Sequence, residues 1–96
     1  MKKMLIAASV FLLAANVQAA QDPEAVYAKS CAMCHNGQLP MAPKKGDVAA
    51  WEPRLAQGMP TLVKHVTEGF NAMPARGLCM DCTPEDYEAV ITWMAK

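Results

Sequence analysis

The stretch Cys31-Ala32-Met33-Cys34-His35 decides how this chain of 96 residues is interpreted. On a helical turn, the two thiols of a Cys-x-x-Cys pair lie on one face, and the histidine that follows lies close beside them. This geometry suits covalent haem, because the thiols can add to the two vinyl groups on one porphyrin edge while the imidazole reaches the iron. The stretch therefore predicts one haem c, with thioethers from Cys31 and Cys34 and with His35 as an axial ligand.

Three other kinds of site contain the same residue types. A thioredoxin-like redox pair expects a βαβ setting, and the sequence has no alternating β-branched run that would indicate strands. Four thiolates could hold structural zinc, because a second Cys-x-x-Cys pair follows the first after 44 residues, although zinc ribbons use shorter spacings. Two simple disulfides are the third alternative. These readings stay open beside the favoured haem site, and the cysteines concerned are Cys31, Cys34, Cys79 and Cys82.

The first 19 residues have the pattern of a signal peptide. Met1-Lys2-Lys3 is positively charged, the next eleven-residue apolar stretch ends at Ala15, and Val17-Gln18-Ala19 forms a cleavage site. Eleven helical residues reach only about 16 Å, which is short of a ~30 Å membrane core. We therefore expect cleavage after Ala19, a periplasmic protein without stable membrane insertion, and one domain over residues 20–96. A retained membrane anchor is the rival interpretation.

The expected mature chain is small and slightly acidic. It keeps seven Lys and Arg against nine Asp and Glu, a net charge of −2, so nothing indicates nucleic acid as a partner. A domain of this size buries little apolar surface, and such domains usually depend on disulfides, a metal or a cofactor.

The helical signals predict an all-α fold of four to five short helices wrapped around the haem. Asp22 is a predicted N-cap ahead of Pro23, and this first helix should continue into the cysteine pair. Because Pro53 disfavours a continuous helix, we expect two short pieces over 47–51 and 53–57. The remaining expectations are a loop over 36–46, a helix from Pro60 to Gly69, and a last helix capped by Thr83 with the buried face Tyr87, Val90, Ile91 and Met94.

An electron-carrying haem needs a sixth ligand, and methionine sulfur is the frequent partner of histidine. Met73 is the predicted ligand, because its loop between two helices can cross the far face of the haem. Met59 and Met80 rank behind it, and Met59 is expected to pack at a helix start. His65 could supply a nitrogen, but its charged neighbours predict a solvated helix face.

Taken in order, these residues resemble the class I c-type cytochromes, and more narrowly the cytochrome c5 family. The resemblance covers nearly the whole expected mature chain and rests on Cys31-x-x-Cys34-His35, Ala42-Pro43, Gly46-Asp47, Trp51-x-x-Arg54, Gly69, Met73-Pro74-x-x-Gly77 and Cys79-x-x-Cys82. It implies a periplasmic one-electron carrier that is not an enzyme. Its partners would be transient redox proteins such as a membrane quinol-oxidising complex, a terminal oxidase or a reductase.

The resemblance also implies roles for further residues. The Pro43 carbonyl would bind the ring nitrogen of His35, and a disulfide would join Cys79 to Cys82. Trp51 and Arg54 would lie near the haem propionates, as hydrogen-bond donors. Two alternatives to electron transfer remain, namely a gas sensor or enzyme domain with a labile sixth ligand, and the four-cysteine zinc module.

Overall fold

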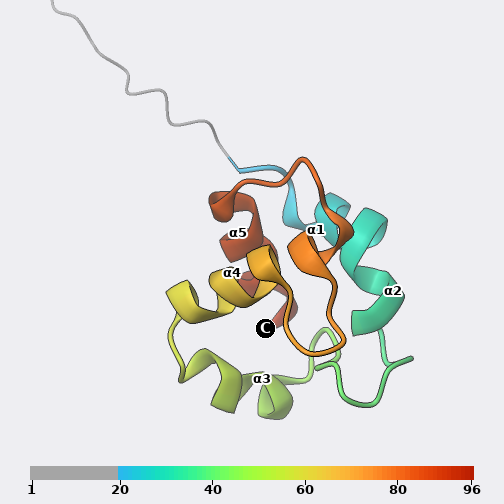
Figure 1. Cartoon of the computed structure of the whole chain (residues 1–96). Helices are drawn as coiled ribbons and strands as arrows, with labels where there is room; N and C mark the ends of the chain where they lie inside the picture. Colours follow the sequence, from blue (N-terminus) through green and yellow to red (C-terminus); the bar gives the residue numbers. More distant parts are fainter. Residues whose placement is uncertain (1–19) are drawn as a thin grey trace, which may run out of the picture.

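The computed structural model describes residues 20–96, and these residues form a mostly helical domain (Figure 1). The predicted signal peptide, residues 1–19, lies outside the described residues. The described part contains no β-strand, and its one β-type pairing is an isolated bridge between Phe70 and Met73. The elements are α1 (Pro23–Val26), the π-helical η1 (Tyr27–Cys31), α2 (Ala32–His35), α3 (Val48–Leu55), α4 (Met59–Glu68), the 3-10 turn η2 (Ala75–Leu78) and α5 (Pro84–Met94). The predicted all-α class is confirmed.

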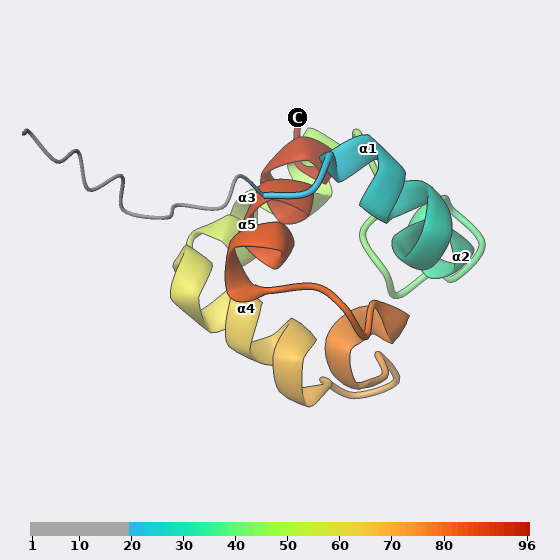
Figure 2. The same cartoon turned by 90° about the horizontal axis from the view of Figure 1, so that it is seen from above.

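Helix α5 organises the packing of the domain. It contacts α1 on one side and α4 on the other, and α4 also contacts η2. Figure 2 shows η2, drawn in orange, between the end of α4 and the α1–α2 side of the molecule. The predicted apolar face of α5 is buried, with Tyr87, Val90, Ile91 and Met94 each 2 to 3% exposed.

The start of α5 is fixed as its sequence predicts. The Thr83 hydroxyl accepts the backbone N–H of Asp86, and the Asp86 carboxylate accepts the backbone N–H of Thr83, which completes a capping box. Asp86 also accepts hydrogen bonds from the backbone N–H and the side-chain amide of Gln21. These bonds tie the segment before α1 to the first turn of α5.

Two helix predictions are wrong in detail. Asp22 stands at the N-cap of α1, but its side chain makes no capping bond, and only its carbonyl takes part in the helix, by accepting the N–H of Val26. The second concerns Pro53, which lies inside a continuous α3 rather than between two pieces. Pro53 and Ala49 are both exposed, so the helical carbonyl that proline leaves without a donor faces water.

The predicted loops are confirmed in outline. No helix forms over 36–46, and α4 ends at Glu68 with Gly69 as its C-cap. Helix α4 begins at Met59 rather than at Pro60, and Met59 packs against the core as expected. The expected loop from Gly69 to Cys82 contains η2, whose 3-10 turn the sequence did not predict.

Candidate functional site

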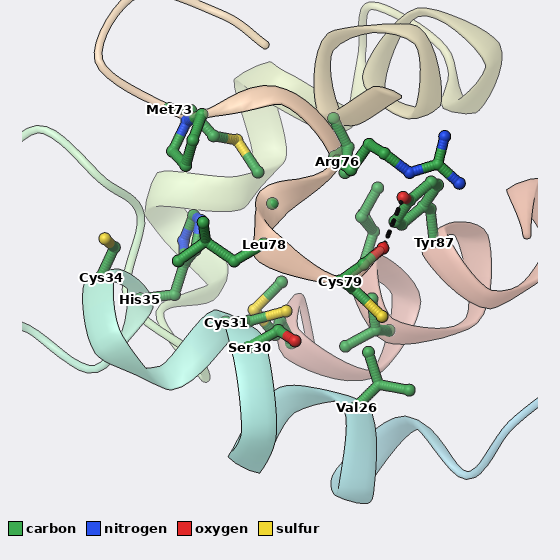
Figure 3. Close-up of a pocket in the computed structure, with 16 residues that line it drawn as sticks. Val26, Ser30, Cys31, Cys34, His35, Met73, Arg76, Leu78, Cys79 and Tyr87 are labelled. Carbon is green, nitrogen blue, oxygen red and sulfur yellow. Dashed lines mark hydrogen bonds between the residues drawn. The ribbon is translucent and has the colours of Figure 1, made fainter. Parts of the chain in front are cut away.

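Two adjoining cavities lie between the helices and the loop after α4. The larger spans about 1000 Å³ and the smaller about 490 Å³, and both volumes include solvent at the open side of the cavity. Most of their lining side chains are apolar. The residues that line both cavities are Cys34, His35, Val66, Met73, Ile91 and Met94. The predicted ligands His35 and Met73 therefore reach one continuous hollow from separate parts of the chain (Figure 3).

The first cysteine pair is unbonded. Cys31 at the end of η1 and Cys34 in α2 are free and half-buried, and both line the smaller cavity. Burial, with repulsion from Cys34 as a smaller contribution, raises the pKa of the Cys31 thiol to about 11. A thioredoxin-like redox cysteine needs a lowered pKa, and its βαβ setting is absent from residues 20–96. The thioredoxin alternative is therefore wrong.

His35 is buried and held in one orientation. Its side chain is 8% exposed, and its Nδ1 lies 2.8 Å from the carbonyl oxygen of Pro43. This is the contact that the resemblance implied for Pro43. The backbone carbonyl of His35 also accepts the N–H of Lys45 at 2.8 Å. With Nδ1 bonded to a carbonyl, Nε2 is the ring nitrogen left to bind a metal.

Met73 is placed by a tight turn at the end of α4. Its backbone N–H donates to the carbonyl of Phe70 at 2.8 Å and its carbonyl accepts the N–H of Phe70 at 3.0 Å. Gly69 permits this turn, because its φ is +90° and a Cβ there would lie 3.1 Å from the Met73 carbonyl oxygen. A Cβ at Gly77 would reach van der Waals contact with the Met73 methyl group, at 3.4 Å, so the two residues lie side by side.

The rival methionines do not occupy comparable places. Met59 and Met80 line neither of the two cavities, and Met80 is 65% exposed. Met41 lines the larger cavity but is 67% exposed. Met94 lines both cavities, as Met73 does, but it lies on the buried face of α5 rather than in the loop after α4. Met73 is thus the methionine whose position best fits the predicted role.

The second cysteine pair forms the disulfide Cys79–Cys82 that the resemblance implied, and both residues are buried. The Tyr87 hydroxyl donates to the Cys79 carbonyl at 3.1 Å, and Arg76 donates to the Cys82 carbonyl at 3.2 Å. The Tyr87 bond fastens the end of the Met73 loop to α5, and the Arg76 bond holds the loop to itself. Since two of the four thiols are used in this disulfide, the four-cysteine zinc site and the pair of simple disulfides are both wrong.

The same loop contains unusual backbone conformations. All three non-glycine residues with positive φ in the described part of the chain lie in it, at Asn71, Arg76 and Leu78. Such conformations are costly and persist where surrounding contacts fix them. Asparagine adopts positive φ more readily than most residues, which fits Asn71. The residue types at Arg76 and Leu78 do not signal such a conformation, and no local pattern signals the contacts of Arg76 and Tyr87 with the disulfide segment.

Of three weaker predictions, those for the Trp51 N–H and for His65 need revision, and that for Arg54 stays a prediction. The indole N–H of Trp51 donates to the Lys44 carbonyl at 3.0 Å, so it is engaged by the protein itself rather than held free for a propionate. Arg54 lines the larger cavity, with one guanidinium nitrogen donating to the Ala50 carbonyl at 2.7 Å. His65 is not on a solvated face, because it is half-buried and stacks on Phe70 with ring centroids 4.0 Å apart.

The residues present fit a covalently bound haem. The hollow offers two free thiols, an imidazole with an available Nε2, and a thioether from a separate loop. Apolar side chains supply most of the remaining surface, which suits a porphyrin.

Comparisons with known proteins agree with this assignment. The family model described as "Cytochrome C oxidase, cbb3-type, subunit III" matches residues 18–94. Cytochrome c5 from Azotobacter vinelandii is 40% identical over 79% of this chain and 94% of its own length. A mono-haem ferrocytochrome c from Shewanella putrefaciens shares 54% identity and a TM-score of 0.71, over 79% of this chain and 94% of that one.

A further solved structure, described as an electron-transfer complex of nitrite reductase with cytochrome c, gives a TM-score of 0.69. It is 34% identical and covers 81% of this chain and all of the matched one. Fold, site and comparisons together define a small class I c-type cytochrome, a class that carries electrons on one covalent haem c. Within that class, the chain belongs to the cytochrome c5 family.

Proposed function

We propose that this chain is a periplasmic one-electron carrier in which Cys31 and Cys34 form the haem thioethers and His35 and Met73 are the axial ligands. The observation that carries the proposal is that His35 and Met73 line the same two cavities, with Nδ1 of His35 already bonded to Pro43. When bound, haem c supplies reversible exchange of one electron between its ferrous and ferric states.

The protein's own groups suit this chemistry. The Pro43 carbonyl orients the His35 ring and raises its basicity. The Met73 thioether favours the ferrous state, and the turn that carries it is fastened at both ends, by Phe70 and by the disulfide segment. If His35 and Met73 both bound the haem iron, it would have no open position for a substrate, and this supports a carrier rather than an enzyme.

The proposed location is the periplasm, after cleavage at Ala19. The disulfide Cys79–Cys82 supports export, because such bonds persist in oxidising compartments. The described residues contain no helix long and apolar enough to cross a membrane. Mass spectrometry of the exported protein tests this directly: we expect a chain that begins at Ala20 and carries the added mass of one haem.

The proposed partners are redox proteins that dock transiently. A structural neighbour forms an electron-transfer complex with nitrite reductase, and the matching family model describes an oxidase subunit. By analogy, we propose a membrane quinol-oxidising complex as electron donor, and a terminal oxidase or reductase as acceptor. Contacts of this kind are small and short-lived.

Visible spectra of the oxidised and reduced protein test the proposed ligands. Replacing Met73 by Ala should abolish the thioether-to-iron band of the oxidised protein and allow carbon monoxide to bind the reduced one. The matched control is Met41→Ala, because Met41 lines the same larger cavity but is exposed at its edge. Loss of the band in a Met59 variant, with the band kept in Met73→Ala, would refute the assignment.

The same spectra decide the alternative function. A gas sensor or enzyme domain has a labile sixth ligand, so the unmodified reduced protein would bind carbon monoxide rapidly. The carrier proposal expects no such binding while Met73 is present.

A further inference from the structure

Hydrogen bonds fix the short segment Pro43–Gly46 between α2 and α3, and each of its four residues takes part as a donor or an acceptor. The Pro43 carbonyl lies 2.8 Å from Nδ1 of His35, and the Lys45 N–H donates to the carbonyl of His35, also at 2.8 Å. Gly46 donates its N–H to the Met94 carbonyl at 2.7 Å. Two successive peptide groups of this segment therefore bind His35, one through its ring and one through its backbone.

Trp51 connects this segment to α3. The side chain is 4% exposed, and its indole N–H donates to the Lys44 carbonyl at 3.0 Å. Lys44 lies between the two residues that bind His35. The Trp51 ring also stacks on the His35 imidazole, with centroids 5.9 Å apart and planes inclined by 27°. Trp51 thus contacts both sides of the Pro43–His35 hydrogen bond. It contacts the His35 ring directly, and it contacts the Pro43–Gly46 segment through the Lys44 carbonyl.

We propose that Trp51 is a positioning residue whose indole N–H, through the Lys44 carbonyl, holds the Pro43 carbonyl against His35 and so sets the electron-donating strength of the imidazole. The inference rests on the proposed function, since it takes His35 to be an iron ligand. It assigns the Trp51 N–H to the histidine side of the site rather than to a haem propionate.

A second donor to the Lys44 carbonyl does not make Trp51 redundant. The backbone N–H of Asp47 also reaches this oxygen, at 3.0 Å, but Asp47 is only three residues further along the same turn. Because this hydrogen bond joins two residues of one turn, it does not fix the turn relative to the rest of the protein. Trp51 is anchored inside α3, so of the two donors to the Lys44 carbonyl its N–H is the one that ties this part of the segment to a helix.

The expected effect has a definite sign. A histidine whose Nδ1–H donates to a well-placed carbonyl is a more basic ligand. A more basic ligand stabilises the ferric state, so a looser Pro43 carbonyl should make reduction easier and move the reduction potential to a more positive value. The His35 ring N–H should also exchange with solvent faster, because its hydrogen bond opens more often.

The experiment uses the haem-loaded protein with Trp51→Phe and, as control, Trp93→Phe. Trp93 lies on α5, packs on Tyr27 at 5.2 Å between centroids, and meets the segment through the Lys45 ammonium rather than through a carbonyl. In the reduced Trp51→Phe protein, we expect the His35 ring N–H signal in proton NMR to exchange about tenfold faster, as for the loss of one ordinary hydrogen bond. The potential should become more positive and the thioether-to-iron band of the oxidised protein should remain. Trp93→Phe should change neither the exchange rate nor the potential.

A second variant separates the N–H from packing and serves if Trp51→Phe fails to fold. In the Trp93→Phe background, benzothienylalanine at position 51 keeps the ring size and replaces the N–H by sulfur. The proposal expects the faster exchange and the positive shift here too. An unchanged exchange rate and potential in this protein would overturn it, even if Trp51→Phe changed both. The spectrum of the unmodified protein is recorded before any variant is compared. If it shows no haem, the proposed function is refuted, and this outcome is distinct from failure of the Trp51 proposal.

Discussion

Replacing Asp86 by Asn tests how much of the domain's stability depends on one buried carboxylate. Asp86 is 3% exposed, and three donors reach its two oxygens: the Gln21 backbone N–H at 2.7 Å, the Gln21 side-chain amide at 2.8 Å and the Thr83 N–H at 2.9 Å. Asparagine offers one acceptor oxygen and turns its NH₂ toward at least one of these donors. We therefore expect the loss of at least one charge-assisted hydrogen bond, about 2 kcal/mol in the free energy of unfolding.

The loss should depend on pH in a predictable direction. Burial, the largest single influence on Asp86, would raise its pKa, but hydrogen bonds from Thr83 and Gln21 outweigh burial and lower the pKa below its ordinary value. A lowered folded-state pKa contributes stability that is present above the unfolded-state pKa of about 4 and is lost as the pH falls through the folded value. The difference between the unmodified and Asp86→Asn proteins should therefore be constant from about pH 5 to 7 and shrink in more acid solution.

Guanidinium denaturation of the haem-loaded proteins, followed by far-ultraviolet circular dichroism at several pH values, measures both effects. The control is Glu85→Gln, which removes an exposed carboxylate from the same helical turn and should cost about 0.5 kcal/mol or less. Equal losses for the two variants at pH 7 would refute the reasoning. So would a loss in Asp86→Asn that stayed unchanged down to pH 3.

Two further predictions concern the loop that carries Met73. Gly69→Ala should cost about 1 kcal/mol more than Gly46→Ala by denaturation, because both glycines have positive φ but only the Cβ at Gly69 meets backbone atoms, at 3.1 Å. The same variant should weaken the thioether-to-iron band, and equal losses at the two glycines would contradict the contact argument. Replacing Cys79 and Cys82 together by Ser should cost about 2 kcal/mol while haem attachment is retained, as measured by denaturation and by the spectrum. Failure to attach haem would show that the disulfide acts before the fold is complete rather than as a stabilising crosslink.

Local sequence patterns predicted the last helix and the loops well. The signals for α5 are Pro84, the capping residues and the spacing of the apolar face, and each of them acts over only a few residues. Such short-range signals can be interpreted without knowing the rest of the fold. Pro53 shows where such local reasoning fails. Its cost depends on whether the carbonyl one turn earlier can reach water, and that depends on how α3 lies on the domain.

The candidate site was predictable only in its chemistry. The cysteine pair, His35 and Met73 could be selected because ligand type and loop position restrict the choice. The partners of Trp51 and His65 could not, because a side chain's hydrogen bonds and stacking partners depend on segments that meet only in the folded chain. The disulfide between Cys79 and Cys82 came from family resemblance, since spacing alone left zinc open.

The two cysteine pairs also bear on how the protein is assembled. Cys31 and Cys79 line the same small cavity (Figure 3). The proposed haem attachment needs the first cysteine pair reduced, whereas the second pair forms a disulfide. A thiol attacks a disulfide only as the thiolate. Burial raises the pKa of the Cys31 thiol to about 11, so in a folded chain without haem Cys31 would attack the neighbouring disulfide more slowly than an exposed thiol. Under the proposed haem attachment at Cys31 and Cys34, the burial of Cys31 would therefore slow exchange between the two cysteine pairs before the thioethers form.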